Sequence, residues 1–391
     1  MTMGLRDKKI KNANQNDSNG ATWVHQSLAQ VKIKVMKGHA DDVNSCEFCF
    51  DDSKIITSSN DMTIKLWDTV TGNQLKTYNG HSSFITGCCP DSENRKLASG
   101  GWDKNLIVWE AETGQILWKA VHEGIITSCH FSSDGKYLVT GTDLDFAICI
   151  WDAREGTLIK KLINHKSTVT CCRFSPFENR ICSTSMDKTT KITDMRTFKT
   201  SNNNITLKLG GHINVISSCC FSSDEHLLAT ASWDKNIQLW DVATGVYRTQ
   251  GPMTLSKGHE GSISACQFSK DGKTLVSSSY DETLVIWDVD NLCQKFALKG
   301  HSGWVNDCSI SQDQKWVLSC SKDKTVRLWN IESSDDIPVV LEHRKNIGLR
   351  IVQCQSCSKP FSIAQLEEAD NNKFCVFCRL EHPSMYEPPV T

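Results

Sequence analysis

Residues 54–68 read KIITSSNDMTIKLWD: an apolar run, a polar turn, and a second apolar run that ends in Trp-Asp. The spacing from Asp61 to Trp67 returns six more times along the chain, with Thr193 replacing Trp in the fourth copy. The pairs are Asp61/Trp67, Asp103/Trp109, Asp145/Trp151, Asp187/Thr193, Asp234/Trp240, Asp281/Trp287 and Asp323/Trp329. A motif kept at fixed phase over seven copies indicates a repeat architecture.

A histidine precedes each of these aspartates by 22 residues, or by 23 in the third copy. The marker histidines are His39, His81, His122, His165, His212, His259 and His301. In the first repeat, four short apolar runs are separated by turn residues: Val43–Phe50, Lys54–Ser58, Thr63–Asp68 and Gln74–Tyr78. This pattern predicts four strands per repeat.

Successive Trp positions, Thr193 included, are 42, 42, 42, 47, 47 and 42 residues apart. The two longer intervals contain the polar segments Thr200–Asn204 and Tyr247–Pro252. Because the Asp-to-Trp phase is unchanged there, we expect both insertions to lie in loops outside the strands.

Gly-His and Trp-Asp pairs recur in most repeats, and they make the chain resemble the WD-repeat β-propeller family. The pairs are Gly38-His39, Gly80-His81, Gly211-His212, Gly258-His259 and Gly300-His301, with Trp67-Asp68, Trp151-Asp152, Trp240-Asp241 and Trp287-Asp288. The resemblance covers residues 31–343. It implies an all-β, seven-bladed β-propeller of four-stranded antiparallel blades around a channel.

Two segments could supply the outer strand that closes the ring. Residues 31–36 alternate apolar and polar side chains, as a half-buried strand does. Ile337–Leu341 is the other candidate, because it leads to His343 at the same distance after Trp329 as His81 follows Trp67. We favour the N-terminal segment.

The family resemblance implies that the His, the Asp, the Trp and a Ser or Thr form one hydrogen-bond network in each blade. The hydroxyl candidates, four residues before each Asp, are Thr57, Ser99, Ser183, Thr230, Ser277 and Ser319. In the third repeat this position is Gly141, Thr140 is the nearest substitute, and the inserted residue in Asp143-Leu144-Asp145 shifts the local register. The fourth blade lacks the indole and should be the loosest.

A His-Ser-Asp set also suggests a hydrolase. Seven copies of one catalytic site would be needless, so we interpret these residues as structural. The chain also lacks a Gly-rich phosphate loop, a nucleophile elbow and an open metal site apart from the repeats, and we therefore expect no enzymatic activity.

A cysteine lies seven residues after every marker histidine: Cys46, Cys88, Cys129, Cys172, Cys219, Cys266 and Cys308. A free Cys packs as a compact hydrophobe, which suits an inner strand. The alternative is a metal or redox ring, but seven thiols spread around a channel are too far apart for one tetrahedral site.

Four further cysteines, Cys354, Cys357, Cys375 and Cys378, form a C-x2-C-x17-C-x2-C pattern. This spacing predicts a zinc site, because two knuckle turns can direct four thiolates at one Zn2+. Four thiolates leave no open coordination position, so the zinc would be structural. His382 is a spare candidate ligand, although a lone His near the chain end is more typically solvated. We expect the zinc module over residues 344–382, with disordered segments at 1–30 and 383–391.

We expect functional residues on the loops, at positions that do not belong to the His, Asp, Trp and Ser or Thr networks. By family resemblance, the residues just before the Asp and three after the His face the top of the ring and contact partners. Five aromatic residues occupy such positions: Trp102, Trp233, Tyr280, Phe84 and Trp304. Exposed aromatic side chains suggest a protein-binding surface, with Trp102, Phe84 and Trp304 clustered across blades 2, 1 and 7. The alternative is that each ring packs on its neighbouring loop.

Blade 3 ends in Trp151-Asp152-Ala153-Arg154, which resembles the Trp-Asp-x-Arg box of some WD-repeat proteins. That resemblance implies docking of Arg154 on the adaptor of a cullin-type ubiquitin ligase. The chain would then be a substrate receptor and not a general interaction scaffold.

Composition limits the remaining classes of function. The net charge is −2 over 391 residues, without a basic stripe. Around the zinc pattern, residues such as Arg344 and Lys345 are balanced by acidic ones such as Glu367 and Glu368, which argues against nucleic-acid binding. We find no apolar run of membrane-spanning length and no apolar signal core. In a chain of this size, 19 cysteines are more typical of reduced thiols than of a disulfide framework. We expect a cytoplasmic or nuclear monomer.

Overall fold

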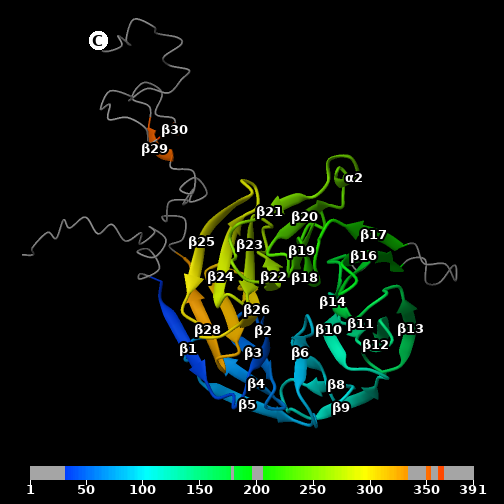
Figure 1. Cartoon of the computed structure of the whole chain (residues 1–391). Helices are drawn as coiled ribbons and strands as arrows, with labels where there is room; N and C mark the ends of the chain where they lie inside the picture. The colour runs from blue at the N-terminus through cyan, green and yellow to red at the C-terminus, as the bar shows by residue number, and fades with distance from the viewer. Residues whose placement is uncertain (1–30, 178–179, 196–205, 333–348, 354–359, 365–391) are drawn as a thin grey trace, which may run out of the picture.

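The computed structural model describes residues 31–177, 180–195, 206–332 and two short strands at 349–353 and 360–364. Within residues 31–332 the described chain forms seven four-stranded antiparallel sheets, arranged as blades around a ring (Figure 1). The expected seven-bladed, four-stranded propeller is confirmed.

Each blade runs from its innermost to its outermost strand in chain order, except blade 7. Blade 1 is β2 (Val43–Cys49), β3 (Lys54–Ser59), β4 (Thr63–Asp68) and β5 (Gln74–Asn79). Blade 2 is β6 (Ile85–Pro90), β7 (Lys96–Gly101), β8 (Asn105–Glu110) and β9 (Ile116–Val121). Blade 3 is β10 (Ile126–Phe131), β11 (Tyr137–Thr142), β12 (Ala147–Asp152) and β13 (Leu158–Ile163). Blade 4 is β14 (Val169–Phe174), β15 (Arg180–Ser185), β16 (Thr189–Asp194) and β17 (Thr206–Gly210).

The remaining blades follow the same plan. Blade 5 is β18 (Ile216–Phe221), β19 (Leu227–Ser232), β20 (Ile237–Asp241) and β21 (Met253–Leu255). Blade 6 is β22 (Ile263–Phe268), β23 (Thr274–Ser279), β24 (Thr283–Asp288) and β25 (Cys293–Lys299). Blade 7 is β26 (Val305–Ile310), β27 (Trp316–Ser321), β28 (Thr325–Asn330) and, as its outer strand, β1 (Ile33–Lys37).

The N-terminal strand closes the ring. β1 pairs antiparallel with β28, with Ile33 opposite Trp329 and Lys37 opposite Thr325. Met36 of β1 is buried in the core between blades 7 and 1. The preference for residues 31–36 is confirmed, and the alternative segment 337–341 lies outside the described residues.

The burial of each strand follows its place in the blade. β3 is buried along nearly its whole length, whereas the outer strand β5 is largely exposed. A central strand of a blade has a neighbouring blade on both faces. Its sequence is therefore a continuous run of apolar and hydroxyl residues and does not alternate between apolar and polar ones.

Seven apolar clusters fill the ring, and each joins residues of two neighbouring blades. Each cluster contains one of the seven marker cysteines: Cys266, Cys308, Cys88, Cys129, Cys46, Cys172 and Cys219, respectively. All seven are buried free thiols, which confirms that they pack as core residues. Some sulfurs of neighbouring blades meet, as Cys220 Sγ and Cys266 Sγ do at 3.7 Å.

The inserted segment in blade 5 forms the one-turn helix α2 (Tyr247–Gln250) between β20 and β21, outside the sheet as expected. The other insertion, 200–204, lies outside the described residues. β29 (Leu349–Gln353) and β30 (Pro360–Ala364) pair antiparallel beyond the propeller sequence. The four zinc-pattern cysteines, His382 and the segments expected to be disordered also lie outside the described residues.

Candidate functional site

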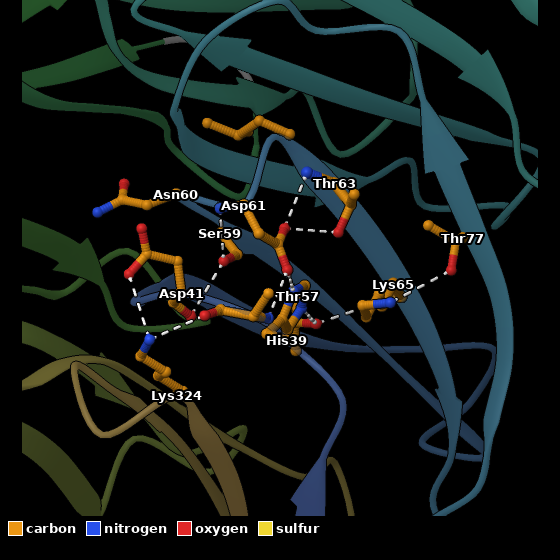
Figure 2. Close-up of polar contacts among 12 residues, drawn as sticks. His39, Asp41, Thr57, Ser59, Asn60, Asp61, Thr63, Lys65, Thr77 and Lys324 are labelled. Carbon is orange, nitrogen blue, oxygen red and sulfur yellow. Dashed lines mark hydrogen bonds and ion pairs between the residues drawn. The ribbon is translucent and has the colours of Figure 1, made fainter.

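The hydrogen-bond network of blade 1 joins its turns to its strands (Figure 2). His39 Nδ1 lies 2.7 Å from Asp61 Oδ2, and His39 Nε2 lies 2.8 Å from Thr57 Oγ1. Trp67 Nε1 donates to the same Thr57 oxygen at 2.9 Å. Asp61 also accepts from the backbone N–H groups of Ala40 and Thr63, both at 3.0 Å. Every member therefore has a partner inside the blade.

The same contacts recur in four further blades with complete networks. The distances from His Nδ1 to the Asp carboxylate are 2.9 Å for His81–Asp103, 2.8 Å for His212–Asp234, 3.1 Å for His259–Asp281 and 2.8 Å for His301–Asp323. The indole donors of these blades reach Ser99, Thr230, Ser277 and Ser319 at 2.8 to 3.0 Å. The hydroxyl positions expected from the sequence are correct in these blades.

The protonation states fit a structural role. Burial lowers the pKa of His81, and the Asp103 carboxylate offsets this only in part. Burial opposes ionisation of its partner Asp103, but the hydrogen bonds from Asn105 and Ser82 and the charge of His81 outweigh it and lower the pKa of Asp103. A neutral His that donates through Nδ1 to an ionised Asp is thus left with Nε2 as an acceptor for the hydroxyl.

Blade 3 corrects one expectation. Thr140 does replace the missing hydroxyl, since Trp151 Nε1 donates to Thr140 Oγ1 at 3.0 Å. However, Asp145 makes no hydrogen bond to His122. It accepts from Thr142 Oγ1 and pairs with Lys161 Nζ at 2.7 Å. The inserted residue lengthens the β11–β12 turn and moves Asp145 away from the histidine.

Blade 4 keeps the His165–Asp187 contact at 3.0 Å and the His165–Ser183 contact at 2.9 Å. Thr193, in place of Trp, is fully buried and lies 3.4 Å from Asn164 Nδ2. A glycine fills the Asn164 position in five repeats. In four of them, a Cβ built on Gly38, Gly80, Gly258 or Gly300 would approach the indole tip of the blade to between 2.3 and 3.0 Å. Blade 4 has thus lost the indole and also the glycine on which the indole tips of blades 1, 2, 6 and 7 pack.

The Asp turns place the candidate partner-binding positions side by side. In each of six blades the backbone N–H of the residue before the Asp donates to the carbonyl of the residue three after the His. Examples are Trp102 to Phe84 at 2.8 Å, Tyr280 to Ser262 at 2.9 Å and Lys322 to Trp304 at 2.9 Å. All of these loops lie at one end of the blades, so they form one face of the ring, which we call the aromatic face.

The aromatic residues form two groups, and not the single cluster of Trp102, Phe84 and Trp304 that we expected. Phe84 and Trp102 contact each other edge to face within blade 2, with ring centroids 5.6 Å apart. Trp304 packs instead on Tyr280, at 5.0 Å, and Tyr280 contacts Trp233 at 6.4 Å. This second group spans blades 5, 6 and 7.

Both groups leave ring surface open to solvent. Trp102 is 53% exposed, Trp304 49% and Phe84 36%. Tyr280 and Trp233 are half-buried, and the Trp233 Nε1 donor is buried with no partner among the described residues. Lys322 Nζ, which the sequence did not single out for this role, lies 4.4 Å over the Trp304 ring. The rings do pack on neighbouring loops, but three of them remain accessible.

Arg154 lies elsewhere. It is exposed in the β12–β13 turn, where its backbone N–H donates to Asp152 Oδ1 at 2.8 Å. Because β12 runs away from the β11–β12 turn, Arg154 is on the face opposite the aromatic one. The two candidate contact regions therefore do not form one surface.

The described residues contain no group of three or more His, Cys, Asp or Glu side chains placed to hold a metal ion. No helix within them is long and apolar enough to cross a membrane.

Comparison with known proteins agrees with this geometry. The model of the WD domain, G-beta repeat, matches residues 30–68, 72–110, 117–152, 156–194, 203–241, 251–288 and 292–330. WD repeat-containing protein 88 of Homo sapiens is 41% identical over 169 residues, which are 42% of this chain and 36% of the human protein. Periodic tryptophan protein 2 of Saccharomyces cerevisiae is 42% identical over 175 residues, 44% of this chain and 19% of the yeast protein.

A third relative is the probable E3 ubiquitin ligase complex SCF subunit sconB of Penicillium rubens. It is 43% identical over 58 residues, 15% of this chain and 8% of the fungal protein. The chain thus matches little more than a third of the length of the human relative and less of the others, so the similarity is partial. The seven matched repeats nevertheless cover more than half of the sequence, and the chain belongs to the WD40, or G-beta repeat, family.

Proposed function

We propose that this protein is a non-catalytic protein–protein interaction scaffold whose partner binds the aromatic face. The WD40 propeller itself suggests an interaction scaffold. The observation that carries the proposal is the group Tyr280–Trp304–Lys322, in which an indole contacts both a second ring and a cation yet stays half exposed. Rigid, half-exposed aromatic side chains bury much apolar area on binding and lose little conformational entropy.

Two features support a binding role over a purely structural one. In the five blades with complete networks, the His, Asp, Trp and hydroxyl groups are satisfied within their own blade, so the aromatic residues are not needed to complete these networks. The open ring faces belong to three side chains from two different blades, so a partner that covers them would contact both blades at once. A partner that carries an apolar anchor beside an acidic side chain would suit Trp304 and Lys322 together.

Affinity capture with the full chain tests the proposal. Trp304→Ala and Trp102→Ala should each reduce the amount of captured partner about tenfold or more, as expected for hot-spot aromatics. The matched control is Phe177→Ala, because Phe177 is 64% exposed and lies in the β14–β15 turn on the opposite face. Equal loss in all three variants, or loss of folding in the two Trp variants, would count against the aromatic face.

The C-terminal cysteines add a second element to the proposal, a structural zinc module. The support is the paired C-x2-C spacing of Cys354/Cys357 and Cys375/Cys378. Purified full chain should contain about one zinc per molecule by elemental mass spectrometry. Cys354→Ser with Cys357→Ser should lower this content, whereas Cys293→Ser, a half-buried thiol of β25, should not. A metal-free wild-type protein would end this part of the proposal.

A substrate receptor of a cullin-type ubiquitin ligase is the second candidate. It is favoured by the exposed Arg154 in the Trp-Asp-x-Arg box and by the match to a protein named as a probable SCF subunit. Arg154→Ala should abolish co-purification of the adaptor, and Arg95→Ala, an exposed arginine in the β6–β7 turn of the same face, should not. Adaptor recovery that is unchanged by Arg154→Ala would exclude docking through this box. For either function we propose a cytoplasmic or nuclear monomer.

A further inference from the structure

One position on the innermost strands differs sharply from blade to blade. It lies eight residues after each marker histidine and holds Glu47, Cys89, His130, Arg173, Cys220, Gln267 and Ser309. These strands surround the ring axis (Figure 1). Arg173 of β14 is the only Arg or Lys in this set of seven. A permanent cation at the axis has no counterpart in the other blades and needs an explanation.

Arg173 lines a pocket of about 280 Å3 between the inner strands of blades 3 to 6. Its apolar wall consists of Phe131, Phe174, Phe221 and Phe268, one from each of these blades. The exposed residues Ser133, Ser223 and Lys270 also line it, so the pocket opens to solvent. They lie in the turns after the innermost strands, on the face opposite the aromatic one. The pocket is therefore separate from the proposed partner surface.

The Arg173 guanidinium has an unsatisfied donor within the part of the chain that the structure describes. Its Nε donor is buried without an acceptor. The carboxylates of Glu47 and Asp307 act on its charge through space. The other blade residues near the axis do not supply the missing acceptors. Asp307 accepts the backbone N–H groups of Cys46, at 3.1 Å, and Cys308, at 2.9 Å. Burial raises the pKa of Glu47 to about 7, although the charge of Arg173 acts to lower it.

A guanidinium has five N–H donors in a planar fork that fits two oxygens of a carboxylate or phosphate. We propose that this pocket binds a small organic oxyanion, which pairs with Arg173 while its apolar part packs against the phenylalanine wall. The volume lies just below the usual range of ligand pockets, roughly 300–1000 Å3, so the ligand is small. Lys270 at the rim, whose Nζ lies 3.3 Å from Gln312 Oε1, adds attraction for an anion.

Calorimetric titration of the full chain tests the pocket with benzoate and phenyl phosphate as probes and neutral benzamide as the matched control. Both anions should bind and benzamide should not. Arg173→Gln should weaken anion binding about tenfold or more, because hydrogen bonds to charged groups are lost. Lys270→Gln should weaken it a few-fold, as loss of a solvent-exposed charge contact does. Arg95→Gln, an exposed arginine paired with Glu93, should leave it unchanged.

Chemical modification of the wild-type protein decides the question if Arg173→Gln fails to fold. Phenylglyoxal modifies arginine side chains, and peptide mass spectrometry reports each site separately. Benzoate should slow modification of Arg173 and leave Arg95 unaffected. Absence of benzoate binding to the wild type, equal binding of benzamide, or equal modification of Arg173 with and without benzoate would each overturn the proposal.

Discussion

Blades 3 and 4 depart from the network of blade 1 in opposite ways. Blade 4 has lost a residue type, since Thr193 replaces the Trp, yet its His165–Asp187 contact is intact at 3.0 Å. Blade 3 keeps His, Asp and Trp, yet the added residue in its turn directs Asp145 to Lys161 at 2.7 Å instead of to His122. Residue identity is therefore not sufficient for the network. The length of the turn decides whether the same residues meet.

The hydroxyl at the centre of the network should show the largest difference between blades. Thr57→Ala removes the partner of both His39 and Trp67 and should lower the free energy of unfolding by about 2–4 kcal/mol, since two buried polar groups are orphaned. Ser183→Ala orphans only His165 and should cost about 1–2 kcal/mol. Denaturant titration followed by Trp fluorescence measures both. Equal losses in the two variants would mean that the hydrogen bond from the indole does not contribute to the free energy of unfolding.

The pH dependence of stability should separate blade 3 from the others. Burial lowers the pKa of His122 to about 4, and the charge of Asp145 offsets this only in part. The unfolded chain, with a His pKa near 6.5, then binds more protons, so His122 reduces stability as the pH falls from 6.5 through 4, by up to about 3 kcal/mol. His122→Asn should flatten this acid loss in melting curves at pH 7, 6, 5 and 4.

The exposed His226→Asn is the control for this measurement and should change the pH profile less than His122→Asn does. His81→Asn should flatten the profile less than His122→Asn does, because Asp103 contacts His81 and Asp145 does not contact His122. Parallel profiles for wild type and His122→Asn would show that this histidine titrates normally.

Restoring the indole of blade 4 should require restoring its glycine. Thr193→Trp alone should destabilise the protein by about 1–3 kcal/mol, because Asn164 occupies the space next to the ring. Adding Asn164→Gly should recover about 1–2 kcal/mol of this loss, a favourable coupling between neighbouring sites. A double-mutant cycle with thermal melting measures it. Strict additivity of the two substitutions would contradict the steric explanation.

Amide hydrogen exchange should show the smallest difference. Backbone amides of β15 and β16 should exchange several-fold faster than those of β11 and β12, because blade 4 lacks the indole that blade 3 keeps. Mass spectrometry of peptic fragments resolves these strands. The alternative outcome, equal protection of both blades, would show that the lost indole does not loosen blade 4.

Several parts of the candidate surface could be predicted from the sequence. The family resemblance, applied at the phase of the Asp and His positions, placed Trp102, Phe84, Tyr280 and Trp304 on one face, because each position is fixed by a short turn. Which rings touch could not be predicted. Trp304 packs on Tyr280 of the preceding blade and not on Phe84, and this depends on side-chain directions across a blade boundary.

The sequence by itself determined the seven blades, the members of five complete networks and the core role of the seven cysteines. The repeats and their strands follow from local periodicity, since strand, turn and strand lie within one repeat. The network members and the inner-strand place of the cysteines follow from the family resemblance of that pattern. Only the tertiary structure decided that β1 closes the ring, that Asp145 pairs with Lys161, and that Arg173 faces a phenylalanine-lined pocket. Each depends on how strands, turns or blades come together in space, and no local pattern specifies those contacts.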